Sequence, residues 1–157
     1  MLQISLPGRD KTLEIKNLLL DLNGTLAVNG VLIPGVKERI DALKSKISIY
    51  LLTADTFGSG KRVAEELGIE VFKVGEIGGR QDKLDFLKSL GSDKTAAIGN
   101  GYNDVLMLKE AALSIAVIEG EGCAVEVLLN ADIAVNNIND ALDLLINPVR
   151  IVATLRS

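Results

Sequence analysis

Short apolar runs rich in β-branched residues recur along the chain, and more polar stretches separate them. Six of these runs predict strands, at residues 18–22, 47–52, 71–74, 95–98, 113–117 and 132–135. The runs are apolar throughout instead of alternating with polar residues, which is typical of strands that are covered on both faces. They therefore indicate a sheet buried between two layers.

The stretches between the strands carry apolar residues at spacings of three and four, which predicts amphipathic helices. Gly68 and Gly91 follow two of these stripes and indicate helix ends, and residues 151–155 predict a further core helix. The stripes comprise Val36, Ile40 and Leu43; Val63 and Leu67; Leu84, Leu87 and Leu90; Val105, Leu106, Leu108 and Ala112; and Val125, Leu128 and Leu129. Strands alternating with helices favour βαβ units with right-handed crossovers, and hence a parallel sheet.

Two turn signals predict hairpins outside this alternation. Residues 2–5 and 13–16 flank a Pro-Gly turn, and residues 27–28 and 31–33 flank Asn29-Gly30, a strong signal for a tight hairpin. The sequence shows no linker, internal repeat or low-complexity segment. We therefore expect one α/β domain over residues 1–157, a three-layer Rossmann-like parallel sheet on which the N-terminal hairpin of residues 1–16 packs.

Composition narrows the chemistry. The 157 residues include no histidine, no tryptophan and one cysteine, Cys123, so catalysis through imidazole and cysteine-rich metal sites are excluded. The formal net charge of −4 and the 3% of aromatic residues argue against nucleic acid as a partner. The longest apolar runs are too short to span a membrane, and the N-terminus does not resemble a signal peptide. We expect a cytoplasmic protein without membrane or nucleic-acid partners.

Polar side chains follow three of the predicted strands. Residues 21–25 (Asp-Leu-Asn-Gly-Thr) follow the first, residues 53–55 (Thr-Ala-Asp) follow the second, and residues 99–104 (Gly-Asn-Gly-Tyr-Asn-Asp) follow the strand at 95–98; Lys83 lies near the start of the preceding helix. Ligands of parallel sheets bind outside the carboxyl ends of the strands. A carboxylate there can attack phosphorus, Mg²⁺ can lie between two carboxylates, and hydroxyl and ammonium groups can hold phosphate oxygens. The pattern predicts a site for phosphoryl chemistry.

These segments resemble, in the same order, the four motifs of the haloacid dehalogenase superfamily of phosphohydrolases. Residues 21–25 resemble its first motif, Asp-x-Asp-Gly-Thr, and residues 52–55 its second, an apolar strand that ends in Thr or Ser. Residues 82–84 resemble the lysine motif, and residues 99–104 the fourth, Gly-Asp-Gly-x-Asn-Asp. The resemblance covers residues 18–135 and is greatest for soluble proteins similar to the catalytic domain of P-type ATPases.

The resemblance implies a nucleophile and a metal site. Asp21 would attack phosphorus and bind Mg²⁺, with the backbone carbonyl of Asn23 as a second ligand. Asn100 and Asp104 would complete the metal site, Asp104 by binding the ion or by orienting it and its waters. Lys83 would neutralise charge on the nucleophile and on the phosphate.

The resemblance also implies how the phosphate is held. Thr53 and the N–H of Ala54 would bind phosphate oxygens together with Lys83. Gly24 would border the substrate and, with Thr25, shape the turn after the nucleophile. The substrate would be a phosphorylated compound of unknown identity.

Two positions depart from the family pattern. Asn23 stands where the general acid/base aspartate is usual, and Asn100 stands where the fourth motif has its first aspartate. An amide cannot deliver or accept a proton at neutral pH, and general acid/base catalysis contributes about 10²–10⁴-fold. We expect slow turnover and weakened Mg²⁺ binding. The alternatives are a catalytically weakened module that binds phosphate or metal for regulation, and a partner subunit that uses this domain for interaction.

Neither interval in which the family inserts a cap, 26–52 or 56–82, has room for one. A second copy, a protein partner or the substrate itself would then serve as the lid.

Several residues keep two interpretations. Asp55 either caps the following helix or belongs to the site. Asn103 is either a helix N-cap or a ligand-binding residue, with the cap slightly favoured. Tyr102 fits a packing or rim position, Lys73 is a less well placed competitor for the role of the lysine, and we expect Cys123 to be a buried small hydrophobe.

Overall fold

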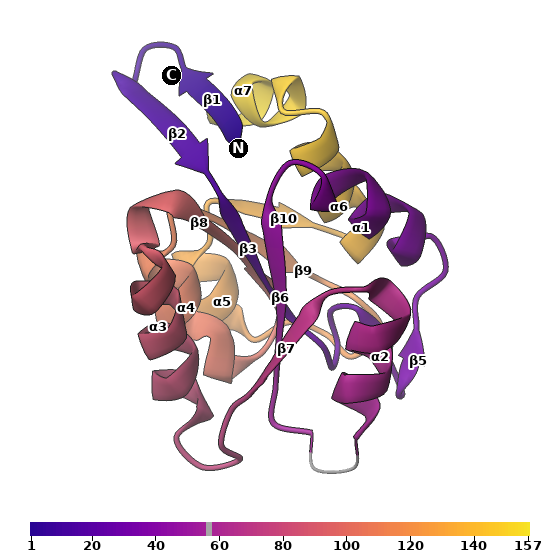
Figure 1. Cartoon of the computed structure of the whole chain (residues 1–157). Helices are drawn as coiled ribbons and strands as arrows, with labels where there is room; N and C mark the ends of the chain where they lie inside the picture. Colours follow the sequence, from indigo (N-terminus) through magenta and orange to yellow (C-terminus); the bar gives the residue numbers. More distant parts are fainter. Residues whose placement is uncertain (56–57) are drawn as a thin grey trace.

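A six-stranded parallel sheet forms the centre of the molecule in a computed structural model that describes residues 1–55 and 58–157 (Figure 1). The strand order is β10-β9-β8-β3-β6-β7. The strands are β3 (Asn17–Asp21), β6 (Ser48–Thr53), β7 (Glu70–Lys73), β8 (Thr95–Gly99), β9 (Leu113–Val117) and β10 (Ile133–Val135). All six predicted strands are present, with ends shifted by one residue at most, and the prediction of a parallel α/β sheet is confirmed.

Helices cover both faces of this sheet, as the continuously apolar strands predict. Leu18 and Leu20 of β3 point to one core and Leu19, between them, points to the other. The first core includes α1 (Val36–Lys44), α2 (Ser59–Leu67), α6 (Ile138–Ile146) and α7 (Val149–Leu155), and the second includes α3 (Gly79–Leu90), α4 (Val105–Glu110) and α5 (Val125–Asn130). Two short 3₁₀ turns, η1 (Ser92–Lys94) and η2 (Tyr102–Asp104), flank β8. The architecture is therefore three-layered.

Two elements differ from the prediction. Strand β7 lies at the edge of the sheet and all four of its residues are exposed, so coverage on both faces fails there. Helix α6 was not predicted, although Asn137 caps its N-terminus by accepting a hydrogen bond from the N–H of Asp140 and its apolar residues have helical spacing. The C-terminal helix begins at Val149, two residues earlier than predicted, and buries Ile151 fully.

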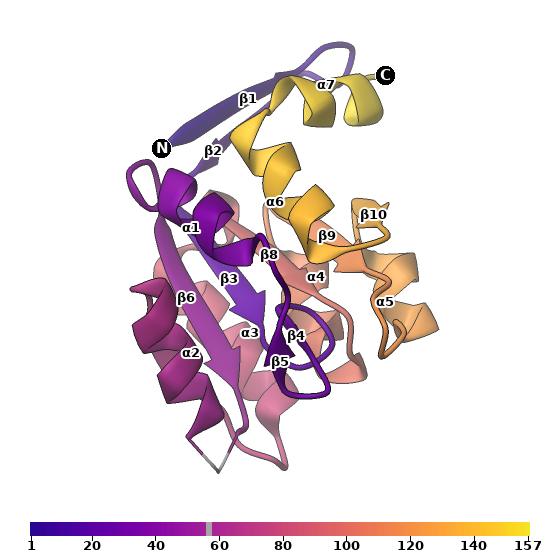
Figure 2. The same ribbon diagram turned by 90° about the vertical axis from the view of Figure 1, so that its right-hand side faces the viewer.

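The N-terminal hairpin lies at the pole opposite the carboxyl ends of the strands (Figures 1 and 2). Strands β1 (Leu2–Leu6) and β2 (Lys11–Ile15) pair antiparallel, and their apolar face joins the first core beside α7. The N–H of Ser157 donates to the carbonyl of Pro7, which ties both ends of the chain together at this pole. Because one core continues from the hairpin to the sheet, we keep the assignment of residues 1–157 to one domain as a proposal.

A second hairpin lies beside the carboxyl end of β3, formed by β4 (Ala27–Val28) and β5 (Val31–Leu32). Asn29 and Gly30 both have positive φ, 52° and 76°, as a two-residue hairpin turn of type I′ requires. Between the first two motif strands lie only this hairpin and α1, and the described residues 58–82 hold α2, β7 and the start of α3; residues 56 and 57 lie outside the described part. In the part of the chain that is described, neither interval contains a cap.

None of the described helices combines the length and the apolar character needed to cross a bilayer.

Candidate active site

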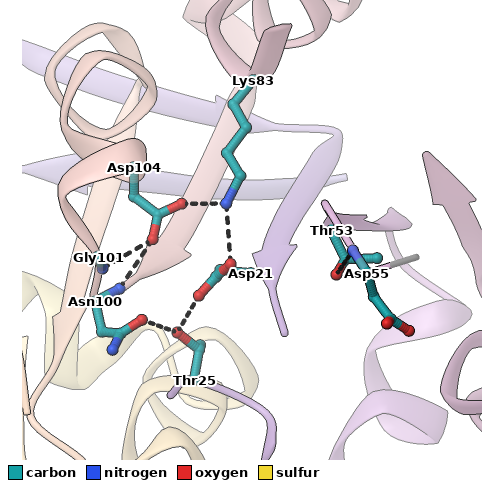
Figure 3. Close-up of polar contacts among 8 residues, drawn as sticks. All are labelled: Asp21, Thr25, Thr53, Asp55, Lys83, Asn100, Gly101 and Asp104. Carbon is teal, nitrogen blue, oxygen red and sulfur yellow. Dashed lines mark hydrogen bonds and ion pairs between the residues drawn. The ribbon is translucent and has the colours of Figure 1, made fainter. Parts of the chain in front are cut away.

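A buried ion-paired cluster lies at the carboxyl end of the central strands (Figure 3). Asp21 is the last residue of β3, and Asp104 ends the η2 turn that follows β8. Lys83 reaches between them from α3, with its Nζ 2.9 Å from Asp21 Oδ1 and 2.6 Å from Asp104 Oδ1. The side chain of Lys83 is 1% exposed, so both ion pairs are shielded from water. Three predicted site residues thus meet at one point.

Backbone donors fix the second oxygen of Asp104. The N–H groups of Asn100 and Gly101 lie 3.1 and 3.0 Å from Asp104 Oδ2. The loop can wrap this closely around the carboxylate because residue 99 is glycine, where a Cβ would lie 2.5 Å from the same oxygen. Asp104 therefore organises the whole turn after β8 as well as holding Lys83.

Thr25 links the nucleophile candidate to the fourth motif. Its Oγ1 lies 3.1 Å from Asp21 Oδ2 and 3.3 Å from Asn100 Oδ1, and its single hydroxyl proton serves one of these acceptors at a time. The Nδ2 of Asn100 donates to the carbonyl of Gly122 at 3.0 Å. Gly24 makes room for this amide, because its φ is +78° and a Cβ there would lie 2.2 Å from Asn100 Nδ2. Both ends of the Asn100 amide are thus engaged.

Burial and charge shift the pKa values of the central pair. Burial and, to a smaller extent, the charge of Asp104 raise the pKa of Asp21, the ammonium of Lys83 opposes the rise, and the net result is a pKa of about 7. Burial works to lower the pKa of Lys83, but the charges of Asp21 and Asp104 outweigh it and the net shift is upward. Lys83 is therefore held as a cation that favours the charged form of Asp21.

The oxygens around Asp21 fit a magnesium ion. The carboxylates of Asp21 and Asp104 both contact the Nζ of Lys83. The Oδ1 of Asn100 lies near Asp21 as well, because Thr25 Oγ1 contacts both side chains. Mg²⁺ prefers such oxygen ligands and is commonly held by one or two carboxylates, with water and phosphate completing its shell. No group of three or more acidic or thiol side chains suited to a metal occurs among the described residues. The donor set therefore suits a site completed by amide, carbonyl and substrate oxygens.

The remaining predicted residues lie around this cluster. Asn23 is exposed, and its side chain takes no part in the hydrogen-bonded cluster of the described residues. Thr53 is buried and accepts a hydrogen bond from the N–H of Asp55 at 3.1 Å, and Ala54 is half-buried beside it. Figure 3 shows Thr53 and Asp55 at a distance from the Asp21–Lys83–Asp104 cluster. The structure thus brings Asp21, Thr25, Lys83, Asn100 and Asp104 into contact, with Thr53 and Ala54 on a separate side.

The structure decides between several of the interpretations left open. Asp55 accepts a hydrogen bond from the N–H of Gly60 at 2.8 Å, in the first turn of α2, which supports the capping interpretation although Gly58 is the N-cap residue itself. Asn103 is exposed inside η2, so the cap interpretation was wrong; residue 104 stands at the N-cap of α4. Lys73 is exposed on β7, and Lys83 occupies the lysine position. Cys123 is half-buried, so the prediction of a buried residue was wrong.

Two features of the surroundings escaped the sequence analysis. The guanidinium of Arg80 lies over the ring of Tyr102, 4.4 Å from its centroid. Glu121 holds the β4–β5 hairpin, because its Oε2 accepts a hydrogen bond from the N–H of Asn29 at 3.2 Å. Arg80 stands three residues before Lys83, a spacing that places both on one helix face; Glu121 is 92 residues from Asn29 and gave no sequence signal.

The chain is similar to proteins that are already known. The family model for haloacid dehalogenase-like hydrolases matches residues 5–112. The uncharacterized protein MJ0073 of Methanocaldococcus jannaschii is 50% identical over 78 residues, which are 47% of this chain and 84% of the relative. A soluble P-type ATPase-like phosphatase of the same organism is 27% identical over 140 residues. These are 87% of this chain but 51% of that relative, so the chain spans about half its length.

Solved structures share the fold. A 3-deoxy-D-manno-octulosonate 8-phosphate phosphatase from Moraxella catarrhalis, determined with magnesium, phosphate and the sugar acid, superposes with a TM-score of 0.70 at 22% identity. The superposition covers 90% of this chain and 94% of that one. At this identity, the likeness supports the fold alone.

Proposed function

Because the chain belongs to the haloacid dehalogenase-like hydrolases, we propose that it is a magnesium-dependent phosphohydrolase in which Asp21 is the nucleophile. The observation that carries the proposal is the buried ion-paired cluster, in which Lys83 joins Asp21 to Asp104. Relatives and structural neighbours that are described as phosphatases support a phosphate ester as the substrate.

In the first step, a carboxylate oxygen of Asp21 forms a bond to phosphorus while the ester bond from phosphorus to the leaving oxygen breaks. The attack needs the charged form of Asp21, which the ammonium of Lys83 favours against burial and the charge of Asp104. Thr25 fixes one oxygen of Asp21 and thereby the orientation of the carboxylate. In the second step, water attacks phosphorus and releases phosphate and free Asp21.

Asp21, the carbonyl of Asn23, the Oδ1 of Asn100 and Asp104 would hold Mg²⁺. Bound there, the ion would offset negative charge on the phosphate and on the carboxylates. Asp104 keeps the loop and Lys83 in place through backbone and ammonium contacts that it already makes. Thr53 and the N–H of Ala54 would hold phosphate oxygens from the side of β6.

The proposed site lacks a side chain at position 23 that can transfer protons. The leaving oxygen must gain a proton in the first step, and the attacking water must lose one in the second. Asn23 can donate a hydrogen bond but can do neither. We therefore propose slow turnover that depends on good leaving groups, and a persistent phosphorylated Asp21.

The second candidate is a regulatory or interaction module that binds phosphate or metal without turnover, and the amide at Asn23 favours it. Incubation with Mg²⁺ and 4-nitrophenyl phosphate separates the two. Release of phosphate that is lost in Asp21→Asn supports the hydrolase. No release, with Mg²⁺-dependent binding of beryllium fluoride, supports the module, and no binding of either leaves a role in interaction alone.

The site is capless in the described part of the chain, so we propose that a second copy, a protein partner or the substrate itself covers it. The β4–β5 hairpin and the 119–123 loop, tied together by Glu121, border the opening on one side. Size-exclusion chromatography with light scattering, with and without phosphate and Mg²⁺, tests whether a second copy supplies the lid.

A further inference from the structure

Arg80 and Tyr102 make a second contact between α3 and the turn that carries Asp104. Arg80 precedes Lys83 by three residues on the same helix face, about 4.5 Å along the helix axis. Tyr102 precedes Asp104 by two residues in η2. The Lys83–Asp104 ion pair and the Arg80–Tyr102 contact therefore lie one above the other, and the second pair is nearer the start of α3.

The guanidinium of Arg80 has no carboxylate partner within residues 1–55 and 58–157, and its buried Nε makes no hydrogen bond there. Arg39 shows the contrast, because its Nε and Nη2 both donate to the carboxylate of Asp143. A buried donor without an acceptor is costly. A guanidinium stacked on an aromatic ring is held in orientation, and the terminal Nη groups of Arg80, unlike its buried Nε, can still donate to an oxyanion.

We propose that Arg80, held by Tyr102, binds a second oxyanion of the substrate. The substrate is then a phosphate ester that also carries a carboxylate or another phosphate, a short distance from the phosphate that reacts. This inference rests on the proposed phosphate site at Asp21 and Lys83. It gives the capless site a source of specificity that belongs to the core domain itself.

Binding of unreactive phosphonates tests the inference without turnover. Calorimetric titration with Mg²⁺ present compares phenylphosphonate, 3-carboxyphenylphosphonate, 3-carbamoylphenylphosphonate and 1,3-phenylenebisphosphonate. We expect the wild-type protein to bind the carboxylate or the bisphosphonate roughly tenfold tighter than phenylphosphonate, as one charge-assisted contact implies. The neutral carbamoyl probe should show no such preference, and the stronger of the two anionic probes identifies the second oxyanion.

Variants assign the preference to Arg80. Arg80→Gln should reduce the ratio of affinities to about one, and Tyr102→Ala should reduce it while Tyr102→Phe retains it, because the ring and not the hydroxyl orients the guanidinium. Arg150→Gln, on α7 at the opposite pole, is the control for loss of one positive charge. A wild-type protein without the preference, or a preference that survives Arg80→Gln, overturns the inference.

Turnover of 4-nitrophenyl phosphate, measured in parallel, separates this inference from the proposed function. Turnover without the preference overturns the role of Arg80 and leaves the hydrolase intact. The preference without turnover supports the second oxyanion site and counts against hydrolysis. Failure to bind any of the phosphonates overturns both.

Discussion

Replacement of Lys83 by methionine should destabilise the protein strongly, in a way that depends on pH. The ammonium is 1% exposed and pairs with Asp21 at 2.9 Å and with Asp104 at 2.6 Å, so its removal leaves two buried carboxylates without a cation. Removing one partner of a buried ion pair costs about 3–5 kcal/mol. For a domain of this size, the loss lowers the melting temperature by roughly 6–20 °C. Lys88→Met, an exposed lysine on the same helix, should change it little.

The pH dependence follows from the pKa of Asp21, which already lies near 7 in the wild-type protein and loses an opposing charge in Lys83→Met. A carboxyl whose pKa is raised in the folded state destabilises the protein above that pKa, and the penalty disappears as the pH falls toward the unfolded value of 3.8. The loss in Lys83→Met should therefore be much larger at pH 8 than at pH 5.

Urea unfolding monitored by circular dichroism at both pH values measures the loss. Addition of Mg²⁺ at pH 8 should recover part of it, because a second cation can take the place of the ammonium. A loss below about 1 kcal/mol at pH 8, or an equal loss at pH 5 and pH 8, would refute the reasoning that Lys83 compensates buried charge.

Three further predictions concern the asparagines and the nucleophile. Asn23→Asp should restore an acid/base group at an exposed position and raise kcat on alkyl phosphates by about 10²–10⁴-fold, with the melting temperature unchanged. If the variant and the wild-type protein have the same kcat on alkyl phosphates, position 23 takes no part in proton transfer. Asn100→Asp should lower the melting temperature of the metal-free protein, because a carboxylate cannot donate to the Gly122 carbonyl and adds charge beside Asp21. Mg²⁺ should restore the melting temperature, and calorimetry with and without Mg²⁺ tests both expectations. Without metal, the raised pKa of Asp21 means that the folded state binds an extra proton between about pH 4 and pH 7, so the free energy of unfolding should fall as pH rises through this range. Urea unfolding should show that Asp21→Asn removes this decline.

The sheet, and the edge of it at which the candidate site lies, could be predicted because both depend on patterns within short segments of the sequence. Each core strand is a continuous apolar run, and the parallel order places the ends of β3, β6 and β8 at one edge, whichever residues follow. Lys83 was placed through the motif that it resembles, and its pairing with Asp104 across 21 residues is a tertiary contact that spacing alone does not specify. Strand β7 looked like the others because an edge strand can be as apolar as a central one.

Contacts between distant residues explain most of what the sequence did not reveal. Arg80 and Tyr102 meet only because α3 packs against η2, and neither residue type is unusual in its own segment. Helix α6 is the exception, because its cap residue and apolar stripe are local signals that the sequence does carry. Cys123 has small and apolar neighbours in the sequence, which suggested burial. In the structure it follows Gly122, whose carbonyl accepts from the distant Asn100 amide, and its side chain is only half-buried.

The asparagine at position 100 has a structural explanation that the motif comparison does not supply. Its Nδ2 donates to the Gly122 carbonyl, and the adjacent Glu121 accepts from the N–H of Asn29 at the tip of the β4–β5 hairpin. An aspartate could accept from Thr25 as Asn100 does, but it has no donor for the carbonyl. Compared with an aspartate, the amide therefore has one negative charge fewer at the proposed metal site and forms a link from Asp21, through Thr25, to the loop that holds the hairpin. Occupancy of the site and the position of the hairpin share this chain of contacts, so Asn100→Ala should loosen the hairpin, seen as faster hydrogen exchange at Asn29, with a larger effect than Thr53→Ala on the other side of the site.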